Sequence, residues 1–407
     1  MCDMLFKYYH IGDDEIQFLT RQFSSIFHNS TASKIRMSCF YNVSEFVSVR
    51  FDNVKSIYDY AFSKGWGNSN NIESFDAPNL EYIGNSVFGC SNMTHFSAPK
   101  VSYIGQYAFQ GCTSLTELSF PELTSLYYSM SYGRWNSAYP FSGCTNLKTL
   151  YMPKLPVVHD SEFAYLSSLE TINLDSCTAI GESAFYQCTH LKSINFSNVE
   201  TVGSSAFAYC SSVSYIKMDK VETLNAMAFG YCFNSSYVSD GYAEFPELSS
   251  MLSYRHFTYC SGLKTFKAPK LKNIGNRAFE YCYNLASLDI PNIEVIESEG
   301  FGSCSKLSMP LSFSKCKTIG YRAFGYCSSL SEIHLDTITS FENEAFNGCI
   351  SLKEIHMASI TSVPTLSGSF GYSLSSLNYI YVPSSLVTAF QTATNWSAYS
   401  SLFSGIY

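Results

Sequence analysis

The sequence is poor in charged residues, and this shortage disfavours several partners. Only 14% of its 407 residues are Asp, Glu, Lys or Arg, and the 25 basic residues are outnumbered by 33 acidic ones. Sequence-independent binding to nucleic acid or to an anionic membrane needs a basic surface that displaces counterions. The net charge of −8 therefore argues against nucleic acid as a partner.

Long apolar runs and a recognisable export signal are also missing. The chain has no run of about 18 apolar residues, the length that a transmembrane helix needs. Its first residues, MCDMLFKYYHIGDDEIQFL, lack the basic end and the apolar stretch of a signal peptide. We therefore expect no membrane insertion and no signal-peptide export.

Sequence motifs of common enzymes are absent as well. The chain contains no Walker loop and no G-x-G-x-x-G, G-x-S-x-G or H-E-x-x-H motif. Its hydrophobic share of 46% is nevertheless large enough for an extensive core, which excludes a disordered chain. We expect a folded protein that is not an enzyme, with no catalytic residues and no cofactor.

Aromatic residues are in excess, with 32 Phe and 31 Tyr, because one motif is repeated along the chain. A phenylalanine recurs mostly every 22 residues, and a cysteine follows most of these phenylalanines three positions later. The phenylalanines are Phe62, Phe88, Phe109, Phe141, Phe163, Phe185, Phe207, Phe229, Phe257, Phe279, Phe301, Phe324, Phe346 and Phe370. A full copy begins at Leu263, LKTFKAPKLKNIGNRAFEYC.

The repeat has the pattern L-x-x-L-x-Φ-P-x-L-x-x-I-G-x-x-A-F-x-x-C, where Φ is apolar or Ala. The alternation in L-x-x-L-x-Φ predicts a short strand with one buried face. Proline cannot donate to a strand ladder, so it ends the pairing. The Ile-Gly pair predicts a turn in which glycine adopts a positive φ. Ala, Phe and Cys are predicted to fill the interior.

One repeat cannot bury its own apolar side, but stacked repeats form a continuous core. The sequence therefore predicts a solenoid of about 15 coils of 22–23 residues, built as a curved rod. A parallel β-sheet would line its concave face, with loops or short helical turns on the convex face. The solenoid is predicted over residues 41–383.

Terminal segments are predicted to cover the exposed end coils. Residues 1–40 form the N-terminal cap, because the segment 13–27 places its apolar residues on one side of a helix. Residues 384–407 form a C-terminal helical cap, whose helix is predicted to begin with a serine cap at Ser384 or Ser385.

The repeat resembles the BspA-like leucine-rich repeat, whose units carry L-x-x-L-x-L-P and I-G-x-x-A-F-x-x-C in this order. The match covers roughly residues 42–383. The chain departs from the commoner leucine-rich repeat, because an apolar residue such as Leu123 or Leu271 stands where that repeat has Asn or Cys. The resemblance implies a non-catalytic solenoid used for adhesion and recognition at the surfaces of bacteria, some protozoa and phage particles.

The repeated cysteines are predicted to form a ladder of buried, reduced thiols. Fifteen cysteines are an odd number, and most occupy equivalent positions in successive coils. Stacking separates these positions by about 4.8 Å, whereas the Cβ atoms of a disulfide lie about 3.8 Å apart. Cys2, Cys39, Cys177 and Cys316 fall outside this ladder.

Three insertions interrupt the repeat, at residues 63–70, 127–138 and 233–243. Their Gly, Ser and Asn content predicts loops. Trp66 and Trp135 lie in the first two insertions. Such residues either bind sugar rings or a partner protein or fold back over a coil.

The outward positions of each predicted strand form a polar stripe with some aromatic residues. Two copies of E-I-H, 22 residues apart, should bring Glu332, His334, Glu354 and His356 onto one face. Two histidines and two carboxylates can hold Zn²⁺ or act as an acid–base set, but repeat duplication on a solvated surface gives the same pattern. We expect the solvated surface, with no metal site.

The sequence thus predicts a recognition or adhesion protein that binds a cell-surface protein or glycan, located at a cell surface, outside the cell or on a virion. An intracellular scaffold, located in the cytoplasm, is the alternative. The candidate ligand-binding residues on the concave face and the loops are Glu332, His334, Glu354, His356, Tyr379, Tyr381, Tyr151, Tyr215, Trp66 and Trp135.

Overall fold

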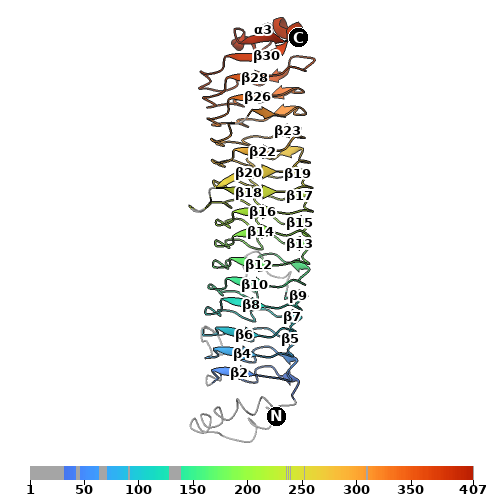
Figure 1. Cartoon of the computed structure of the whole chain (residues 1–407), viewed down its shortest axis with the longest axis vertical. Helices are drawn as coiled ribbons and strands as arrows, with labels where there is room; N and C mark the ends of the chain where they lie inside the picture. The colour runs from blue at the N-terminus through green and yellow to red at the C-terminus, as the bar shows by residue number, and fades with distance from the viewer. Residues whose placement is uncertain are drawn as a thin grey trace. The chain divides into compact units, whose positions relative to one another are not determined.

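The computed structural model describes residues 32–42, 46–63, 71–89, 92–127, 139–234, 236, 238, 240–251, 253–308 and 310–406. The chain divides into two compact units, residues 1–177 with 187–189 (unit 1) and residues 178–186 with 190–407 (unit 2). Both are parallel-strand β-solenoids, with about 16 turns in all and little helix (Figure 1). The solenoid prediction is confirmed, while the helix predicted at 13–27 lies outside the described residues.

Each coil contributes two short strands rather than the one that the sequence predicts. The first is the L-x-x-L-x-Φ segment, usually three residues long, and these segments form the long-strand ladder of each unit. The second is a two-residue strand that ends on the Ile of Ile-Gly or on the apolar residue in its place, and these strands form the short-strand ladder. The short-strand ladder stands where the sequence predicts loops or helical turns (Figure 1).

In unit 1 the long strands form two three-stranded parallel sheets, and all but the last of the short strands form one five-stranded parallel sheet. The long-strand ladder contains β2 (Ser48–Arg50), β4 (Ser74–Asp76), β6 (His95–Ser97), β8 (Glu117–Ser119), β10 (Thr149–Tyr151) and β12 (Thr171–Asn173). The short strands are β1 (Lys34–Ile35), β3 (Ser56–Ile57), β5 (Tyr82–Ile83), β7 (Tyr103–Ile104), β9 (Ser125–Leu126) and β11 (Val157–Val158). Because β1 pairs with β3, the ladder begins within the segment 1–40 that was predicted as a cap.

Unit 2 has the same two kinds of strand: its long strands belong to two parallel sheets, and its last seven short strands form one parallel sheet. Its long strands are β14 (Ser193–Asn195), β16 (Tyr215–Lys217), β18 (Gly241–Glu244), β20 (Leu263–Lys267), β22 (Ser287–Asp289), β24 (Leu311–Ser312), β26 (Glu332–His334), β28 (Glu354–His356) and β30 (Tyr379–Pro383). Its short strands are β13 (Ala179–Ile180), β15 (Thr201–Val202), β17 (Thr223–Leu224), β19 (Ser250–Met251), β21 (Asn273–Ile274), β23 (Val295–Ile296), β25 (Thr318–Ile319), β27 (Ser340–Phe341) and β29 (Thr365–Leu366).

The chain after β30 closes unit 2. A 3-10 turn, η1 (Ser384–Leu386), leads into helix α3 (Val387–Thr392), a second 3-10 turn η2 (Ser397–Tyr399) and strand β31 (Phe403–Ile406), which pairs with β30. Neither η1 nor α3 has a side-chain cap, so the predicted serine cap is wrong. None of the helices in the described ranges is both long and apolar enough to cross a membrane.

The prediction of a positive φ at the Ile-Gly glycines is also wrong. Among the described residues, the glycines with positive φ are Gly111, Gly143, Gly348, Gly368 and Gly371, none of which follows such an isoleucine. The glycine is needed for close approach instead. A Cβ at Gly275 would lie 2.4 Å from the backbone oxygen of Ser253 in the preceding coil.

Residues with side chains adopt the positive φ angles instead. In many coils these are the second residue before Phe and the second residue after it, as at Arg255 (59°) and Tyr259 (57°) or Arg277 (54°) and Tyr281 (64°). This conformation is unfavourable for residues with a Cβ. Packing between the coils must therefore offset its cost.

The repeated phenylalanines form stacks in the core. In unit 2, the ring centroids of Phe207 and Phe229 lie 5.4 Å apart, and those of Phe229 and Phe257 lie 5.2 Å apart. In unit 1, the rings of Phe88 and Phe109 are 5.3 Å apart. All five rings are completely buried, so each coil places its largest apolar group against the same group of the next coil.

The described ladder cysteines are free and buried, as their spacing predicts. The Cys232 thiol donates to the backbone oxygen of Phe207 at 3.1 Å, and the Cys282 thiol donates to that of Phe257 at 3.0 Å. Burial raises the pKa of Cys327 to about 12. The side chains of Cys177 and Cys316 are also buried; they take the apolar position that Leu271 holds in its own repeat.

The third predicted loop, 233–243, is only partly correct. Phe233 is completely buried, and strand β18 begins at Gly241. Trp66 and Trp135, in the other two predicted loops, lie outside the described residues. The third tryptophan, Trp396, is buried and donates from Nε1 to the Pro364 oxygen at 2.7 Å.

Two coils carry an ionisable residue at the buried alanine position before Phe. In unit 1, burial raises the pKa of Glu162 to about 8, although its Oε2 accepts from the His159 N–H at 2.8 Å. In unit 2, burial lowers the pKa of His256 to about 4, an effect that the Leu224 carbonyl partly offsets. Neither ring nitrogen of His256 has a hydrogen bond of good geometry to the described residues.

We predict that the ladder thiols are unreactive in the folded protein, because they are buried and hydrogen-bonded. Reaction with Ellman's reagent should label ladder cysteines only after denaturation. Mass spectrometry of the labelled peptides would locate the reactive thiols. Labelling of Cys232 or Cys282 in the native protein as fast as in denaturant would contradict the prediction.

We predict that His256→Ala reduces the loss of stability of unit 2 in acid. Native His256 stays neutral down to pH about 4, whereas the unfolded chain binds a proton below its ordinary pKa of 6.5. Stability is therefore lost as the pH falls between these values, by up to about 3 kcal/mol. Urea denaturation at pH 8 and pH 5, with the exposed His190→Ala as control, would measure this difference. Equal acid losses in the wild type and His256→Ala would contradict it.

Candidate functional site

The outward side chains of the long-strand ladder form the first candidate surface, here called the strand face. In β26, β28 and β30, the isoleucines Ile333, Ile355 and Ile380 are completely buried. Side chains alternate along a strand, so the residues on either side of each isoleucine point outward. Every coil thus adds two outward side chains to the strand face.

The aromatic patch, defined as Glu332, His334, Glu354, His356, Tyr379 and Tyr381, lies at the C-terminal end of this face. Strand pairing aligns its residues in two rows. Glu332 pairs with Glu354, which pairs with Tyr379, while His334 pairs with His356, which pairs with Tyr381. The structure therefore brings together the four residues of the two E-I-H copies, as their spacing predicts, and places Tyr379 and Tyr381 beside them.

Four rings of the aromatic patch stack on one another. The imidazole centroids of His334 and His356 lie 4.2 Å apart at an interplanar angle of 12°. The ring of His356 lies 4.5 Å from that of Tyr381, which lies 5.6 Å from that of Tyr379. Tyr379 remains 49% exposed, so the stack ends in an accessible ring.

The two glutamates of the patch lie against the imidazole nitrogens. Glu332 Oε1 is 2.6 Å from His334 Nε2 and 3.4 Å from His356 Nε2. Glu354 Oε2 is 3.0 Å from His356 Nε2. These contacts hold the rings and carboxylates in a fixed arrangement on the two strands.

The remaining predicted residues lie apart from this patch. Tyr215 stacks on Tyr242 at 5.6 Å in the sheet of β14 to β22, and Lys267 Nζ lies 5.4 Å from the Tyr242 ring. Burial, together with the hydrogen bond that the Tyr242 hydroxyl donates to Glu244 at 2.6 Å, raises the pKa of Tyr242 to about 12. Tyr151 is exposed on β10 of unit 1.

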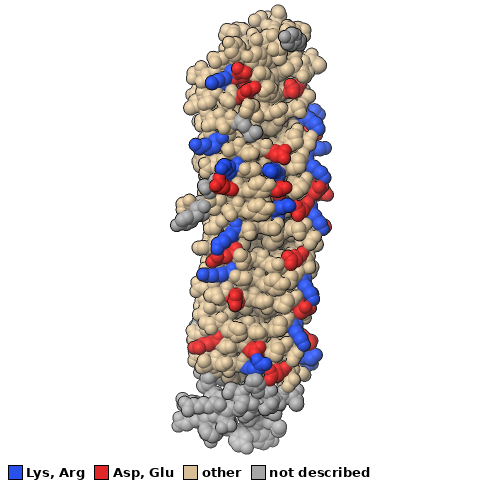
Figure 2. Space-filling model, viewed as in Figure 1, with Lys and Arg blue, Asp and Glu red and all other residues tan. Residues whose placement is uncertain are grey.

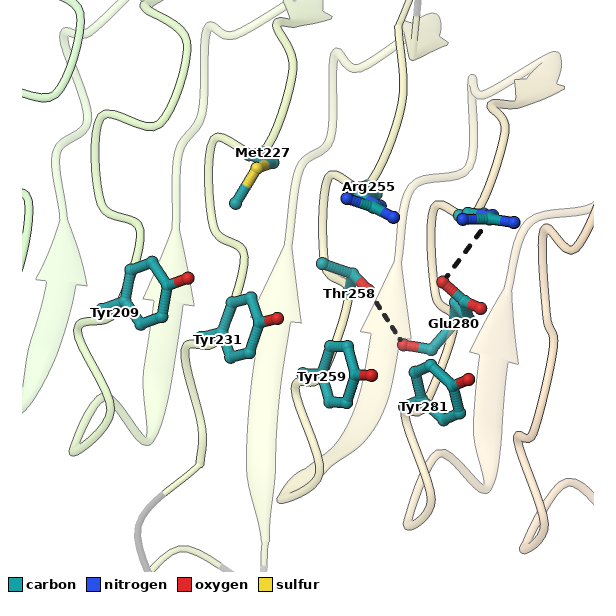
Figure 3. A pocket seen from close by; sticks show the side chains of 9 residues that line it. Tyr209, Met227, Tyr231, Arg255, Thr258, Tyr259, Glu280 and Tyr281 are labelled. Atoms are coloured by element: carbon teal, nitrogen blue, oxygen red, sulfur yellow. Dashed lines mark hydrogen bonds and ion pairs between the residues drawn. The ribbon is translucent and has the colours of Figure 1, made fainter.

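A second candidate surface, the tyrosine groove, was missed by sequence reasoning. It is a groove of about 420 Å³ in unit 2, lined by Tyr209, Met227, Tyr231, Arg255, Thr258, Tyr259, Arg277, Glu280 and Tyr281. Figure 3 shows its four tyrosine rings side by side, with their hydroxyl groups pointing the same way. Consecutive ring centroids are separated by 4.4, 4.8 and 4.4 Å.

A row of longer side chains faces the tyrosines. Arg277 forms an ion pair with Glu299, and its Nε lies 3.9 Å from Glu280 Oε2. Burial raises the pKa of Glu280, and the positive charge of Arg277 partly offsets this rise. Arg255 forms no ion pair with any residue in the described part of the chain. The groove therefore combines phenol hydroxyls with an unpaired guanidinium.

The sequence did contain a signal for the tyrosine groove. Tyrosine stands two positions after the repeated phenylalanine in consecutive coils, at the site that Gly111, Gly143 and Gly348 occupy elsewhere. All of these residues have positive φ, which suits glycine and is costly for tyrosine. The tyrosines can persist there because their stacking stabilises them.

Charges of both signs are interspersed on the surface shown in Figure 2, and no large patch of one sign covers it. Many pair between neighbouring coils. Lys154 Nζ lies 2.6 Å from a Glu122 oxygen in unit 1, and Lys264 Nζ lies 2.6 Å from an Asp240 oxygen in unit 2. Such exposed pairs contribute little to stability.

Comparison with protein families gives one matching model, the BspA type leucine rich repeat region, in six copies. The matched segments are residues 11–134, 137–236, 233–353 and 308–395. No curated protein matches the chain in sequence.

Solved structures of leucine-rich repeat proteins are similar to this chain. A leucine-rich repeat protein from Bacteroides ovatus is 20% identical with a TM-score of 0.40, and the alignment covers 75% of this chain and 88% of that one. A leucine rich cell surface protein from Faecalibacterium prausnitzii is 22% identical with a TM-score of 0.37, covering 76% and 84%. A leucine-rich repeat protein from Eubacterium ventriosum is 18% identical with a TM-score of 0.32, covering 83% of each chain.

Proposed function

Because the chain belongs to the BspA-type leucine-rich repeat family, we propose that it is a non-catalytic recognition protein that adheres to a cell-surface protein or glycan through the aromatic patch. Leucine-rich repeat proteins bind proteins, and members of the family are generally non-catalytic. The family is typically surface-associated. Family membership does not identify the binding surface or the partner.

The stack of four rings in the aromatic patch carries this proposal. Aromatic side chains offer large contact areas, and an ordered stack loses little conformational entropy on binding. Buried isoleucines anchor the three strands beneath the stack. Tyr379 and Tyr381 would therefore act as the principal anchors for a partner.

The carboxylates of the patch give it polar specificity. Glu332 and Glu354 lie in the row beside the imidazoles and can accept hydrogen bonds from a partner. A protein surface with hydroxyl or basic groups, or a sugar ring packed on tyrosine, matches this combination. Further contacts are proposed at Tyr151 and Tyr215 on the strand faces and at Trp66 and Trp135 in the inserted segments.

The free, buried thiols favour a second candidate, an intracellular scaffold for protein–protein interaction. Thiols stay reduced in the cytosol, whereas exposure to an oxidising environment promotes disulfides. A protein that folds inside a cell and leaves it on a phage particle would also retain them. The scaffold and the virion component therefore differ in location rather than in the binding surface.

We predict that the Tyr379→Ala/Tyr381→Ala variant binds cells at least about tenfold more weakly than the wild type, because it removes the two anchors. Labelled full-length protein would be titrated onto a panel of intact bacterial and mammalian cells. The matched control is Tyr231→Gly/Tyr259→Gly, which removes two rings from the tyrosine groove and supplies the residue that suits a positive φ.

Unchanged affinity in Tyr379→Ala/Tyr381→Ala would contradict the role of the aromatic patch. A selective loss in the groove variant would place recognition in the tyrosine groove instead. The absence of saturable binding to every cell type would contradict the adhesion proposal and favour the scaffold.

A further inference from the structure

We propose that Glu332, His334 and His356, with Glu354 beside them, form a binding site for a divalent transition-metal ion such as Zn²⁺ or Co²⁺. The proposal concerns the free protein and requires no partner. The sequence alone favours a solvated surface at these residues. The structure also gives the positions of their ligand atoms, and these positions favour a metal site.

The ligand atoms converge on one point of the strand face. One ligand atom from each of Glu332, His334 and His356 lies within 4.8 Å of the other two. Glu332 Oε1 is shared between the two imidazoles, at 2.6 Å from His334 Nε2 and 3.4 Å from His356 Nε2. Glu354 Oε2 lies 3.0 Å from the same His356 Nε2.

These separations are close to those of ligands around a bound metal. Zn²⁺ holds nitrogen and oxygen ligands at about 2.0–2.2 Å in a tetrahedron, which places neighbouring ligand atoms about 3.3 Å apart. The contact between His356 Nε2 and Glu332 Oε1 already has this length. The shorter contact to His334 would open by less than about 1 Å on metal binding.

The chemistry of the donors selects the class of ion. Imidazole suits Zn²⁺, Cu²⁺, Fe²⁺ and Ni²⁺, whereas Mg²⁺ and Ca²⁺ prefer oxygen ligands. Two imidazoles distinguish this cluster from ordinary acidic surface groups. The two carboxylates add oxygen ligands, which Zn²⁺ accepts alongside imidazole nitrogen.

The two strands hold the donors in place before any metal binds. β26 and β28 pair in register from Glu332 to His334, and the isoleucines between the ligands are buried. The His356 ring packs between His334 and Tyr381, at 4.2 and 4.5 Å. The side chains therefore have little conformational freedom left to lose on binding, so the site is preorganised.

The side chains of His334 and His356 are 35% and 19% exposed, so an ion can enter from solvent. Three protein ligands on an open face also leave a fourth position for water. The site would therefore exchange its metal with the solution rather than hold it as a closed structural centre.

Cobalt titration of the full-length protein tests this proposal. We expect one Co²⁺ per chain by isothermal titration calorimetry, with weak visible d–d absorption and no cysteine-to-cobalt charge-transfer band. His334→Ala and His356→Ala should each weaken binding at least about tenfold, and Glu332→Gln should weaken it similarly. The exposed histidine variants His95→Ala and His190→Ala are the matched controls and should bind as the wild type does.

A measurement on the wild type covers the case in which a variant does not fold. Paramagnetic Co²⁺ should shift or broaden the imidazole proton resonances of two histidines at one equivalent. No binding up to millimolar cobalt, equal affinity in the wild type and in folded His334→Ala and His356→Ala variants, or a cysteine charge-transfer band would overturn the proposal. The cell-binding proposal is tested with the variant at Tyr379 and Tyr381, so its outcome is independent of the cobalt titration.

Discussion

Parallel pairing between equivalent residues of neighbouring coils is the constraint on which each unit depends. It fixes the spacing of the coils at about 4.8 Å and aligns every position of one repeat with the same position of the next. A residue type that recurs in the repeat therefore contacts its own copies. The core phenylalanines and the buried thiols are two such rows, and both are inaccessible to a partner.

The same alignment produces the candidate surfaces. The outward positions lie outside the core, so the residues there can differ between coils without loss of core packing. The E-I-H sequence in two adjacent coils places imidazole on imidazole and carboxylate beside carboxylate. Tyrosines at a positive-φ position form the row that lines the tyrosine groove. The surfaces proposed for recognition and for metal binding thus arise from the register that also stabilises the fold.

Sequence periodicity was sufficient to predict the features that recur with the repeat. The long strands, the phenylalanine stack, the thiol ladder and the meeting of Glu332, His334, Glu354 and His356 follow from equivalent positions alone. The short-strand ladder was missed because two residues are too few to show an alternation. The glycine of Ile-Gly was given the wrong role because a close backbone approach and a positive φ both favour glycine. The tyrosine groove was missed because the two variable positions between Phe and Cys were given no role in the repeat.

A crystal structure of the protein grown with Co²⁺, with anomalous diffraction recorded at the cobalt edge, tests the account most directly. The account predicts Glu332 aligned with Glu354, His334 aligned with His356, and one anomalous peak within bonding distance of Glu332, His334 and His356. A shifted register between β26 and β28, or a cobalt peak only at other residues, would contradict the claim that coil alignment builds the site.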